Sequence, residues 1–213
     1  VIPPLLWPED TVGTVSPGLP APLDRLAGVP VFASSLDGWC NTLGIGAIRD
    51  GGFYIVSGTS DIIGLIHRLP VQIEGLATVP WTQDLFHMGG VIQSGGDCLN
   101  WFADALADFL PAPMPLDKLV EKLLALPRDR HAPIFLPYLT GERVPIWQPH
   151  VRAGFLGIDR EHGFADLLWS VLEGVAFANR HALELAADRA GVPIGEVRIT
   201  GGAARLDAWC QLR

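Results

Sequence analysis

VRITGGAAR, residues 197–205, combines a β-branched run, a pair of glycines and the first residues of a helix. The run at 197–200 predicts a strand, and Gly201-Gly202-Ala203-Ala204 opens the helix that follows. Upstream, apolar residues at helical spacing predict one long helix over 163–189, which stops at Gly191. Strand, glycine turn and helix in alternation are typical of an α/β layered domain.

The preceding part of the chain continues this alternation. Strands are expected at 30–34, 53–56, 61–67, 87–92 and 134–136, and helices at 23–27, 39–45, 97–109 and 116–126. The strands at 53–56 and 61–67 predict a hairpin. The apolar run at 30–34 predicts a buried strand. The first 22 residues are rich in proline and glycine, which indicates a connector with at most short strands.

The composition limits the classes of function. The 213 residues carry a formal net charge of −8, and 49% of them are hydrophobic. An acidic chain with scattered Lys and Arg lacks the basic stripe that nucleic-acid binding needs. No apolar run reaches the ~18 residues of a membrane-spanning helix. We therefore expect a piece of a larger protein whose other part covers apolar surface, with no nucleic-acid or membrane partner.

The ends of the chain and its cysteines agree with this expectation. The chain begins at Val1 without a charged and apolar leader, so no secretory signal is predicted, and it stops at Arg213 soon after a helix has begun. Cys40, Cys98 and Cys210 are odd in number and lack CxxC spacing, so neither a disulfide framework nor a zinc site is expected. A reduced, cytoplasmic location follows.

Three turns of small residues are candidate phosphate-binding segments: Gly58-Thr59-Ser60, Gln93-Ser94-Gly95-Gly96 and Gly201-Gly202-Ala203. Phosphate groups bind backbone N–H groups that they can approach closely, and a helix that begins at the turn adds its positive dipole end. The last two turns follow predicted strands and open predicted helices. Taken singly, each is weak evidence, because a glycine pair is more often an ordinary turn. The sequence contains neither a P-loop nor a Rossmann glycine motif.

Asp37 is the candidate catalytic residue. It follows the apolar run at 30–34, in the position where ligands of α/β sheets bind. A carboxylate there can accept the proton of an attacking hydroxyl. The alternative is structural, because Asp is also a preferred N-cap for the helix expected from residue 39. The two roles are compatible, and the residues alone leave both open.

Two further pairs indicate local packing. Glu142-Arg143 lies among prolines and aromatic residues, which favours an ordered loop. Glu173-Gly174 lies within the long helix, where glycine costs about 1 kcal/mol relative to alanine. Another element is therefore expected to pack closely on that backbone. The six histidines show no metal-ligand spacing, and no residue of the chain is predicted to bind a metal.

Together these stretches resemble the carboxy-terminal domain of the FGGY carbohydrate kinases, the family of xylulose, ribulose and glycerol kinases. Five blocks are similar, in the family's order. They are Leu36-Asp37-Gly38 (the catalytic aspartate), Ser57-Gly58-Thr59-Ser60 (a phosphate loop), residues 136–145 (the PYLxGER-x-P block), residues 153–173 (the second signature) and residues 199–211 (the adenosine loop). One such block would be weak, whereas five in register are specific.

The resemblance implies a ribonuclease H-like, actin-like ATPase fold, with this chain as the carboxy-terminal lobe of a two-lobed sugar kinase, truncated at both ends. It implies ATP and Mg²⁺ bound between the lobes. Asp37 would deprotonate a sugar or polyol hydroxyl for attack on the γ-phosphate. The cofactor-binding residues would be Gly58, Thr59 and Ser60 at the β- and γ-phosphates, and Gly95, Gly96, Gly201, Gly202 and Ala203 around the α-phosphate, ribose and adenine.

The resemblance also implies a division of the chain. Residues 1–22 would connect to the absent amino-terminal lobe, and residues 23–213 would form the nucleotide-binding domain, incomplete at its end. The absent lobe would supply most sugar contacts, so the substrate stays open and the isolated chain is expected to be inactive. Leu206 replaces the Asn of some members, which removes a polar contact near the adenosine.

A second function stays open at this point. An actin-like ATPase or a regulatory nucleotide-binding module would use the same turns without transferring phosphate to a sugar. The oligomeric state is also open, and a homodimer is one of the states that the resemblance allows.

Overall fold

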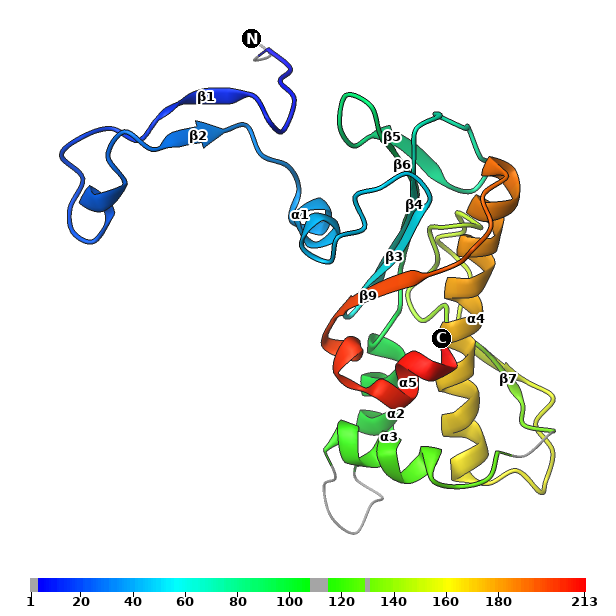
Figure 1. Cartoon of the computed structure of the whole chain (residues 1–213). Coiled ribbons are helices and arrows are strands. Elements are labelled where there is room, and N and C mark those ends of the chain that lie inside the picture. The colour runs from blue at the N-terminus through cyan, green and yellow to red at the C-terminus, as the bar shows by residue number, and fades with distance from the viewer. Residues whose placement is uncertain (1–3, 108–114, 129–130) are drawn as a thin grey trace.

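A computed structural model describes residues 4–107, 115–128 and 131–213 of the chain. Its centre is a five-stranded mixed sheet in the order β5-β6-β4-β3-β9 (Figure 1). The strands are β3 (Gly52–Ser57), β4 (Asp61–His67), β5 (Ala77–Pro80), β6 (Phe86–Ile92) and β9 (Val197–Gly201). β3 to β6 pair antiparallel, whereas β9 returns from far along the chain and pairs parallel to β3. The sheet therefore joins the beginning and the end of the domain.

The long helix α4 (Phe164–Ala190) packs against β4 and β6 and continues past the sheet (Figure 1). Its second half buries Ala182, Leu183 and Ala186 against the sheet. Its first half buries apolar residues in a second cluster with α2 (Asp97–Ala107), α3 (Leu116–Leu124), α5 (Asp207–Leu212) and β7 (Ile134–Leu136). Because the apolar residues recur every three or four positions, one helix serves both clusters.

The remaining small elements connect these layers. β7 pairs with β8 (Gly154–Leu156), and a 3₁₀ helix, η2 (Gly202–Arg205), separates β9 from α5. In the described part of the chain, no helix has the length and apolar character needed to cross a membrane.

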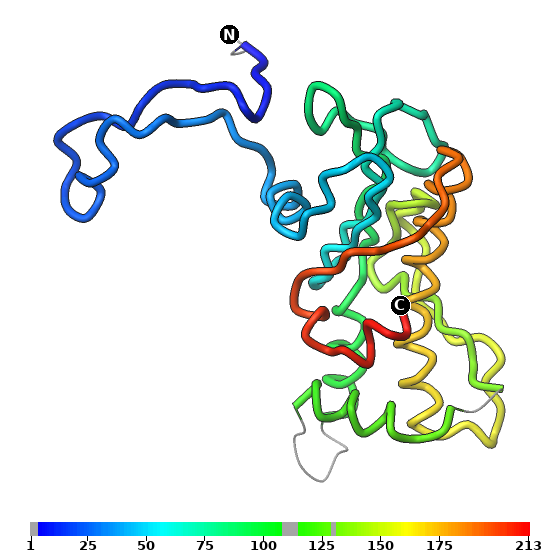
Figure 2. Tube along the Cα trace, viewed as in Figure 1, coloured from blue at the N-terminus to red at the C-terminus, as the bar shows by residue number. Residues whose placement is uncertain are grey.

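Residues 4–36 form an arm that extends away from the sheet (Figure 2). The arm contains β1 (Thr11–Thr14), the 3₁₀ helix η1 (Leu23–Leu26) and β2 (Pro30–Phe32), all of them exposed. The prediction of a buried strand at 30–34 is therefore wrong. β2 pairs with β1 rather than with the five-stranded sheet, and Phe32 is 54% exposed because no other described element covers the ribbon.

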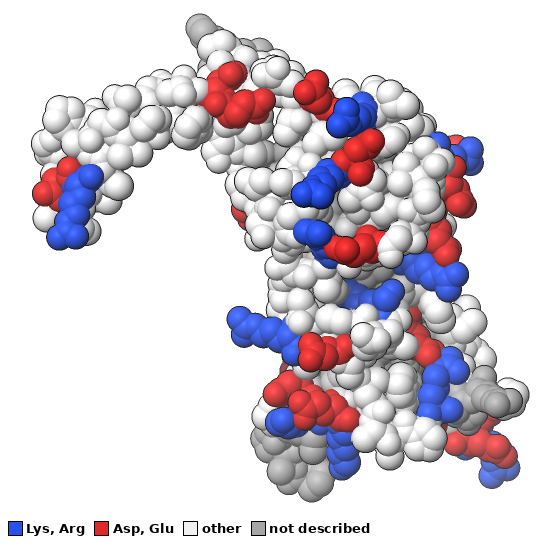
Figure 3. Space-filling model, in the orientation of Figure 1, with Lys and Arg blue, Asp and Glu red and all other residues white. Residues whose placement is uncertain are grey.

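The arm differs from the rest of the surface in its charge. Figure 3 shows acidic and basic side chains interspersed over the body, whereas most of the arm is uncharged. Its exposed large apolar residues are Leu5, Leu6, Trp7, Val12, Leu19, Leu23, Leu26, Val29, Val31, Phe32 and Leu36. A run of exposed apolar residues of this kind is typical of a region that contacts other protein.

Most predicted elements are confirmed. The helix expected at 39–45 begins two residues earlier, as α1 (Asp37–Gly44), and the hairpin of β3 and β4 turns at Gly58-Thr59-Ser60. Gly191 ends α4 in the left-handed conformation, with φ 68°. α2 is described as far as Ala107, so its predicted end at 109 lies outside the described residues. Two strands were not predicted. β5 contains Pro80, which is unfavourable in a strand, and β8 is only three residues long, too short for a recognisable pattern.

Gly174 confirms the expected close packing inside α4. A Cβ at this position would collide with the backbone carbonyl of Phe135 in β7. In an open helix, Gly→Ala stabilises by about 1 kcal/mol. We expect Gly174→Ala instead to destabilise the protein by about 1–3 kcal/mol, as overpacking does. Urea denaturation measures the change. Gly44→Ala, in α1 with open space around its Cβ, is the control and is expected to be neutral or stabilising.

His87 makes the stability depend on pH. It is buried in β6 beside Tyr54, with ring centroids 5.8 Å apart, and its Nε2 lies 3.4 Å from the Ile63 carbonyl oxygen. Burial lowers its pKa from 6.5 to about 4. As the pH falls, His87 is therefore protonated in the unfolded chain before it is protonated in the folded protein. This favours unfolding, and the free energy of unfolding drops by roughly 3 kcal/mol between pH 6.5 and 4.

The test compares urea denaturation of the wild type and His87→Gln at pH 7 and pH 4. The variant is expected to lose less stability on acidification because glutamine does not titrate. An equal loss in both proteins would exclude His87 as the source.

Candidate functional site

The three small-residue turns predicted to bind phosphate meet at one end of the five-stranded sheet. The N–H groups of Gly95 and Asp97 donate to the Thr59 carbonyl (2.8 and 3.2 Å), and that of Gly96 donates to the Gly58 carbonyl (2.8 Å). Gly201, at the end of β9, lies opposite Ser57, at the end of β3. The strand order and the backbone hydrogen bonds thus bring together the turns that contain Gly58, Gly95 and Gly201.

These turns border a pocket of about 260 Å³. Its lining residues are Gly58, Thr59, Gly96, Leu99, Asn100, Leu116, Gly202, Ala203, Leu206 and Trp209. One side is backbone and small side chains from the turns. The other side is largely apolar and comes from α2, α3 and α5. The arrangement offers close approach to main-chain groups at one end and an apolar surface at the other.

Three of the predicted residues lie behind this pocket rather than in its lining. The Ser60 carbonyl accepts the N–H of Gly58 (3.0 Å), which closes the hairpin turn. A Cβ at Gly95 would overlap the Asp61 carboxylate, and one at Gly201 (φ 96°) would overlap the Ser57 carbonyl. Glycine at 95 and 201 therefore allows the turns to come together, while Gly58, Thr59, Gly96, Gly202 and Ala203 face the space between them.

Sequence reasoning did not find the polar cluster behind the turns. The Asp61 carboxylate accepts from Ser57 Oγ (2.7 Å) and Asn179 Nδ2 (3.0 Å), and it forms an ion pair with Arg213. Both side chains of the pair are buried. The four residues come from β3, β4, α4 and the end of the chain, so no local pattern could have indicated them.

Glu142 supports the second turn from another direction. It is 4% exposed, and its Oε1 accepts the N–H groups of Gln93 (2.7 Å) and Arg143 (2.8 Å). Burial raises its pKa. The ordered loop expected around Glu142-Arg143 is thus confirmed, and its carboxylate fixes the start of the turn that leads into α2.

Asp37 is the first residue of α1 and is exposed. Its Oδ1 accepts the N–H of Gly38 (2.7 Å), and a Cβ at Gly38 would lie 2.9 Å from Ile62 Cδ1. Ile62 is in β4, just after the Gly58-Thr59-Ser60 turn. The first turn of α1 therefore packs beside the strand that carries this turn.

Two expectations about Asp37 need correction. Leu36, not Asp37, is the N-cap of α1. The strand before Asp37 is β2, which belongs to the arm and not to the five-stranded sheet. Asp37 therefore does not lie at the end of a strand of the main sheet, as predicted. Its position is set instead by the packing of α1.

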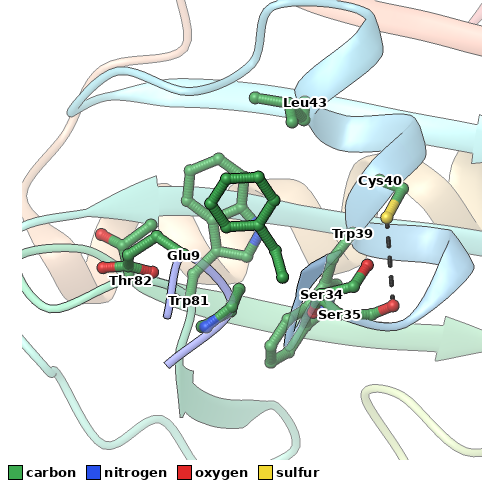
Figure 4. A pocket seen from close by; sticks show the side chains of 10 residues that line it. Glu9, Ser34, Ser35, Trp39, Cys40, Leu43, Trp81 and Thr82 are labelled. Carbon is green, nitrogen blue, oxygen red and sulfur yellow. Dashed lines mark hydrogen bonds between the residues drawn. The ribbon is translucent and has the colours of Figure 1, made fainter. Parts of the chain in front are cut away.

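A second pocket of about 310 Å³ lies beside α1, between the helix, the arm and the segment after β5. Figure 4 shows Trp39, Cys40 and Leu43 of α1 on one side and Trp81 and Thr82 on the other. Phe32, Ser34 and Ser35 complete the edge toward the arm. This pocket is mainly apolar and lies next to the segment that carries Asp37.

The carboxy-terminal domain of the FGGY family of carbohydrate kinases matches residues 53–213, well over half of the chain. The chain belongs to this family. The matched FGGY domain contains all three turns and the polar cluster behind them.

Individual kinases are similar to this chain over more of its length than the family model. The chain is 28% identical over 217 residues to a xylulose kinase of Bacillus subtilis, with 100% of this chain and 42% of that protein covered. It is 30% identical to a gluconokinase of the same organism, covering 86% of this chain and 37% of that protein. The chain therefore spans well under half the length of these FGGY proteins.

A solved structure establishes the fold. The xylulose kinase of Rhodospirillum rubrum superposes with a TM-score of 0.81 at 24% identity, over 99% of this chain and 42% of that one. The predicted fold, an α/β carboxy-terminal lobe of the actin-like type as found in FGGY kinases, is confirmed.

Proposed function

We propose that the full-length protein transfers the γ-phosphate of ATP to a hydroxyl group of a sugar or polyol. The observation that carries this proposal is the meeting of three small-residue turns around one pocket, in a chain of the FGGY family. The named relatives are xylulose, glucono- and glycerol kinases, which supports a small polyhydroxylated acceptor.

The pocket suits a nucleotide. Gly58, Thr59 and Gly96 would face the phosphates, because small residues let phosphate oxygens approach these turns closely. Leu206 and Trp209 would face the base and ribose. ATP is accordingly the cofactor we assign to this pocket.

Mg²⁺ would be held largely by the phosphates of ATP. Among the described residues, no three His, Cys, Asp or Glu side chains gather closely enough to hold a metal. Mg²⁺ in such enzymes commonly uses one or two carboxylates together with substrate phosphates and water. This proposal names no residue of the chain as a metal ligand.

Asp37 would act as general base. Its carboxylate takes the proton of the acceptor hydroxyl while the oxygen attacks the γ-phosphorus in line, and ADP leaves with the electrons of the broken P–O bond. Exposure of Asp37 leaves its carboxylate accessible to a substrate. The neighbouring turn at Gly58-Thr59 would hold the phosphate that is transferred.

The remaining partners belong to the same proposal. The apolar arm would pack against an amino-terminal lobe that supplies most sugar contacts. Residues 1–22 would then be the connector and residues 23–213 the nucleotide-binding domain, in a cytoplasmic protein. A homodimer is compatible with this arrangement.

The test is ADP release by the full-length protein with ATP, Mg²⁺ and a panel of pentuloses, gluconate, tetritols and glycerol. We expect release to depend on one class of acceptor, with one phosphate appearing on that acceptor for each ADP. ATP hydrolysis at the same rate with and without every acceptor would favour the ATPase or regulatory module instead. The 213-residue chain alone is expected to bind nucleotide weakly and to show no turnover.

A further inference from the structure

An ion pair lies directly behind the nucleotide pocket. Asp61 and Arg213 contact each other through Oδ2 and Nη2, and their side chains are 0% and 2% exposed. Isolated charges at such depth are strongly unfavourable. The pair is therefore held by specific surroundings.

Those surroundings satisfy the remaining hydrogen-bonding groups. Arg213 Nη1 donates to Ser57 Oγ (2.6 Å), which itself donates to Asp61 Oδ1 (2.7 Å). Arg213 Nε donates to Asn179 Oδ1 (2.9 Å), and Asn179 Nδ2 donates to Asp61 Oδ2 (3.0 Å). Ser57 and Asn179 thus bridge the two charges, and the planar guanidinium has one orientation that satisfies all of these partners.

The pair connects the two sides of the pocket. Asp61 follows the Gly58-Thr59-Ser60 turn immediately, and its carboxylate occupies the space beside Gly95 where a side chain would otherwise lie. Arg213 follows α5, and its guanidinium lies 4.9 Å from the ring centre of Trp209. Trp209 belongs to the opposite, apolar side of the same pocket.

We propose that Asp61 and Arg213 are positioning residues that set the distance between the phosphate side and the nucleoside side of the pocket. This inference rests on the proposed function, since it assigns the pocket to a nucleotide. Stability alone does not account for the pair, because well-packed apolar residues can replace a buried ion pair without loss of stability. The hydrogen bonds of the Arg213 guanidinium, in contrast, hold the end of α5 at one position relative to the β3–β4 turn.

The experiment uses the full-length protein with three variants: Asp61→Asn, Arg213→Met and both together. Calorimetry measures the Kd for ADP, and steady-state kinetics measures KM for ATP, KM for the acceptor and kcat. We expect the Kd for ADP and the KM for ATP to rise about tenfold in each variant, which corresponds to about 1.4 kcal/mol of binding free energy. The acceptor KM and kcat are expected to stay within about twofold, as when ground-state binding alone is lost.

The double variant distinguishes positioning from simple stabilisation. Each single variant leaves one buried charge unpaired and is therefore expected to lose stability. The double variant removes both charges, so its stability should return toward that of the wild type. If the pair positions the pocket, nucleotide binding stays weak in the double variant, and no weaker than in either single variant. Asp50→Asn, which removes a carboxylate near the surface that pairs with His67, is the matched control and should bind ADP like the wild type.

A folded double variant with wild-type affinity for ADP would overturn the inference while leaving the proposed function intact. A rise in the acceptor KM instead of the nucleotide KM would also overturn it. If the wild-type protein itself bound no ADP, the proposed function would fail and this inference with it.

Discussion

Asp37→Asn in the full-length protein is expected to lower kcat by about 10²–10⁴-fold, the usual contribution of a positioned general base. Asparagine has the same shape, and its Oδ1 can still accept the N–H of Gly38, as Asp37 does over 2.7 Å. It cannot take a proton from the acceptor hydroxyl. The Kd for ATP should stay close to the wild-type value, because Asp37 lies outside the lining of the pocket assigned to the nucleotide.

Single-turnover phosphate transfer, with ATP binding measured separately, checks this result. Asp84→Asn is the control, since Asp84 is an exposed carboxylate after β5 and also lies outside that lining. Normal turnover by Asp37→Asn would remove Asp37 from the mechanism. A large loss of ATP binding would indicate a role in holding the nucleotide instead.

The second large effect is expected at Gly201, where β9 ends. Its φ of 96° is unfavourable for other residues, and a Cβ would overlap the Ser57 carbonyl of the neighbouring strand. With ψ at −172°, Gly201 lies in a region that essentially only glycine adopts and that costs other residues roughly 1–3 kcal/mol, and overpacking against backbone adds about 1–3 kcal/mol. Gly201→Ala should therefore lower the free energy of unfolding by about 3 kcal/mol and the Tm by roughly 6–12 °C.

Gly202→Ala is the matched control one residue later. A Cβ at Gly202 meets no atom within 4 Å, so stability should change by less than about 1 kcal/mol. Gly202 lines the pocket, however, and the added methyl group would occupy space assigned to ATP. We expect Gly201→Ala to unfold at a lower temperature than Gly202→Ala, whereas the affinity for ATP should weaken in both variants. Equal stability of the two would contradict the packing described for Gly201.

The elements that the sequence predicted well are those with local patterns. The β3–β4 hairpin follows from two β-branched runs with a Gly-Thr-Ser turn between them, and α4 follows from its long apolar spacing and Gly191. The three turns were found because small residues are recognisable one segment at a time. Their convergence, by contrast, depends on the parallel pairing of β9 with β3, which no local pattern specifies.

The features that were missed depend on distant partners. The apolar run of β2 indicated burial, but burial is set by what covers a strand, and β2 lies in the arm. Asp61 looked like the polar start of a strand, yet Asn179 and Arg213 make it part of a buried cluster. Leu99 and Asn100 line the pocket only because α2 begins at the second turn.

The pairing of β9 with β3 also affects the order in which the protein can mature during synthesis. Two of the three turns are made early, within the hairpin and the start of α2, while the third follows β9 near residue 201. A ribosome-bound chain that stops before β9 therefore has β3 as an open sheet edge and only part of the pocket. Since a ligand stabilises only the state that binds it, ATP would stabilise the nascent chain only after β9 has emerged.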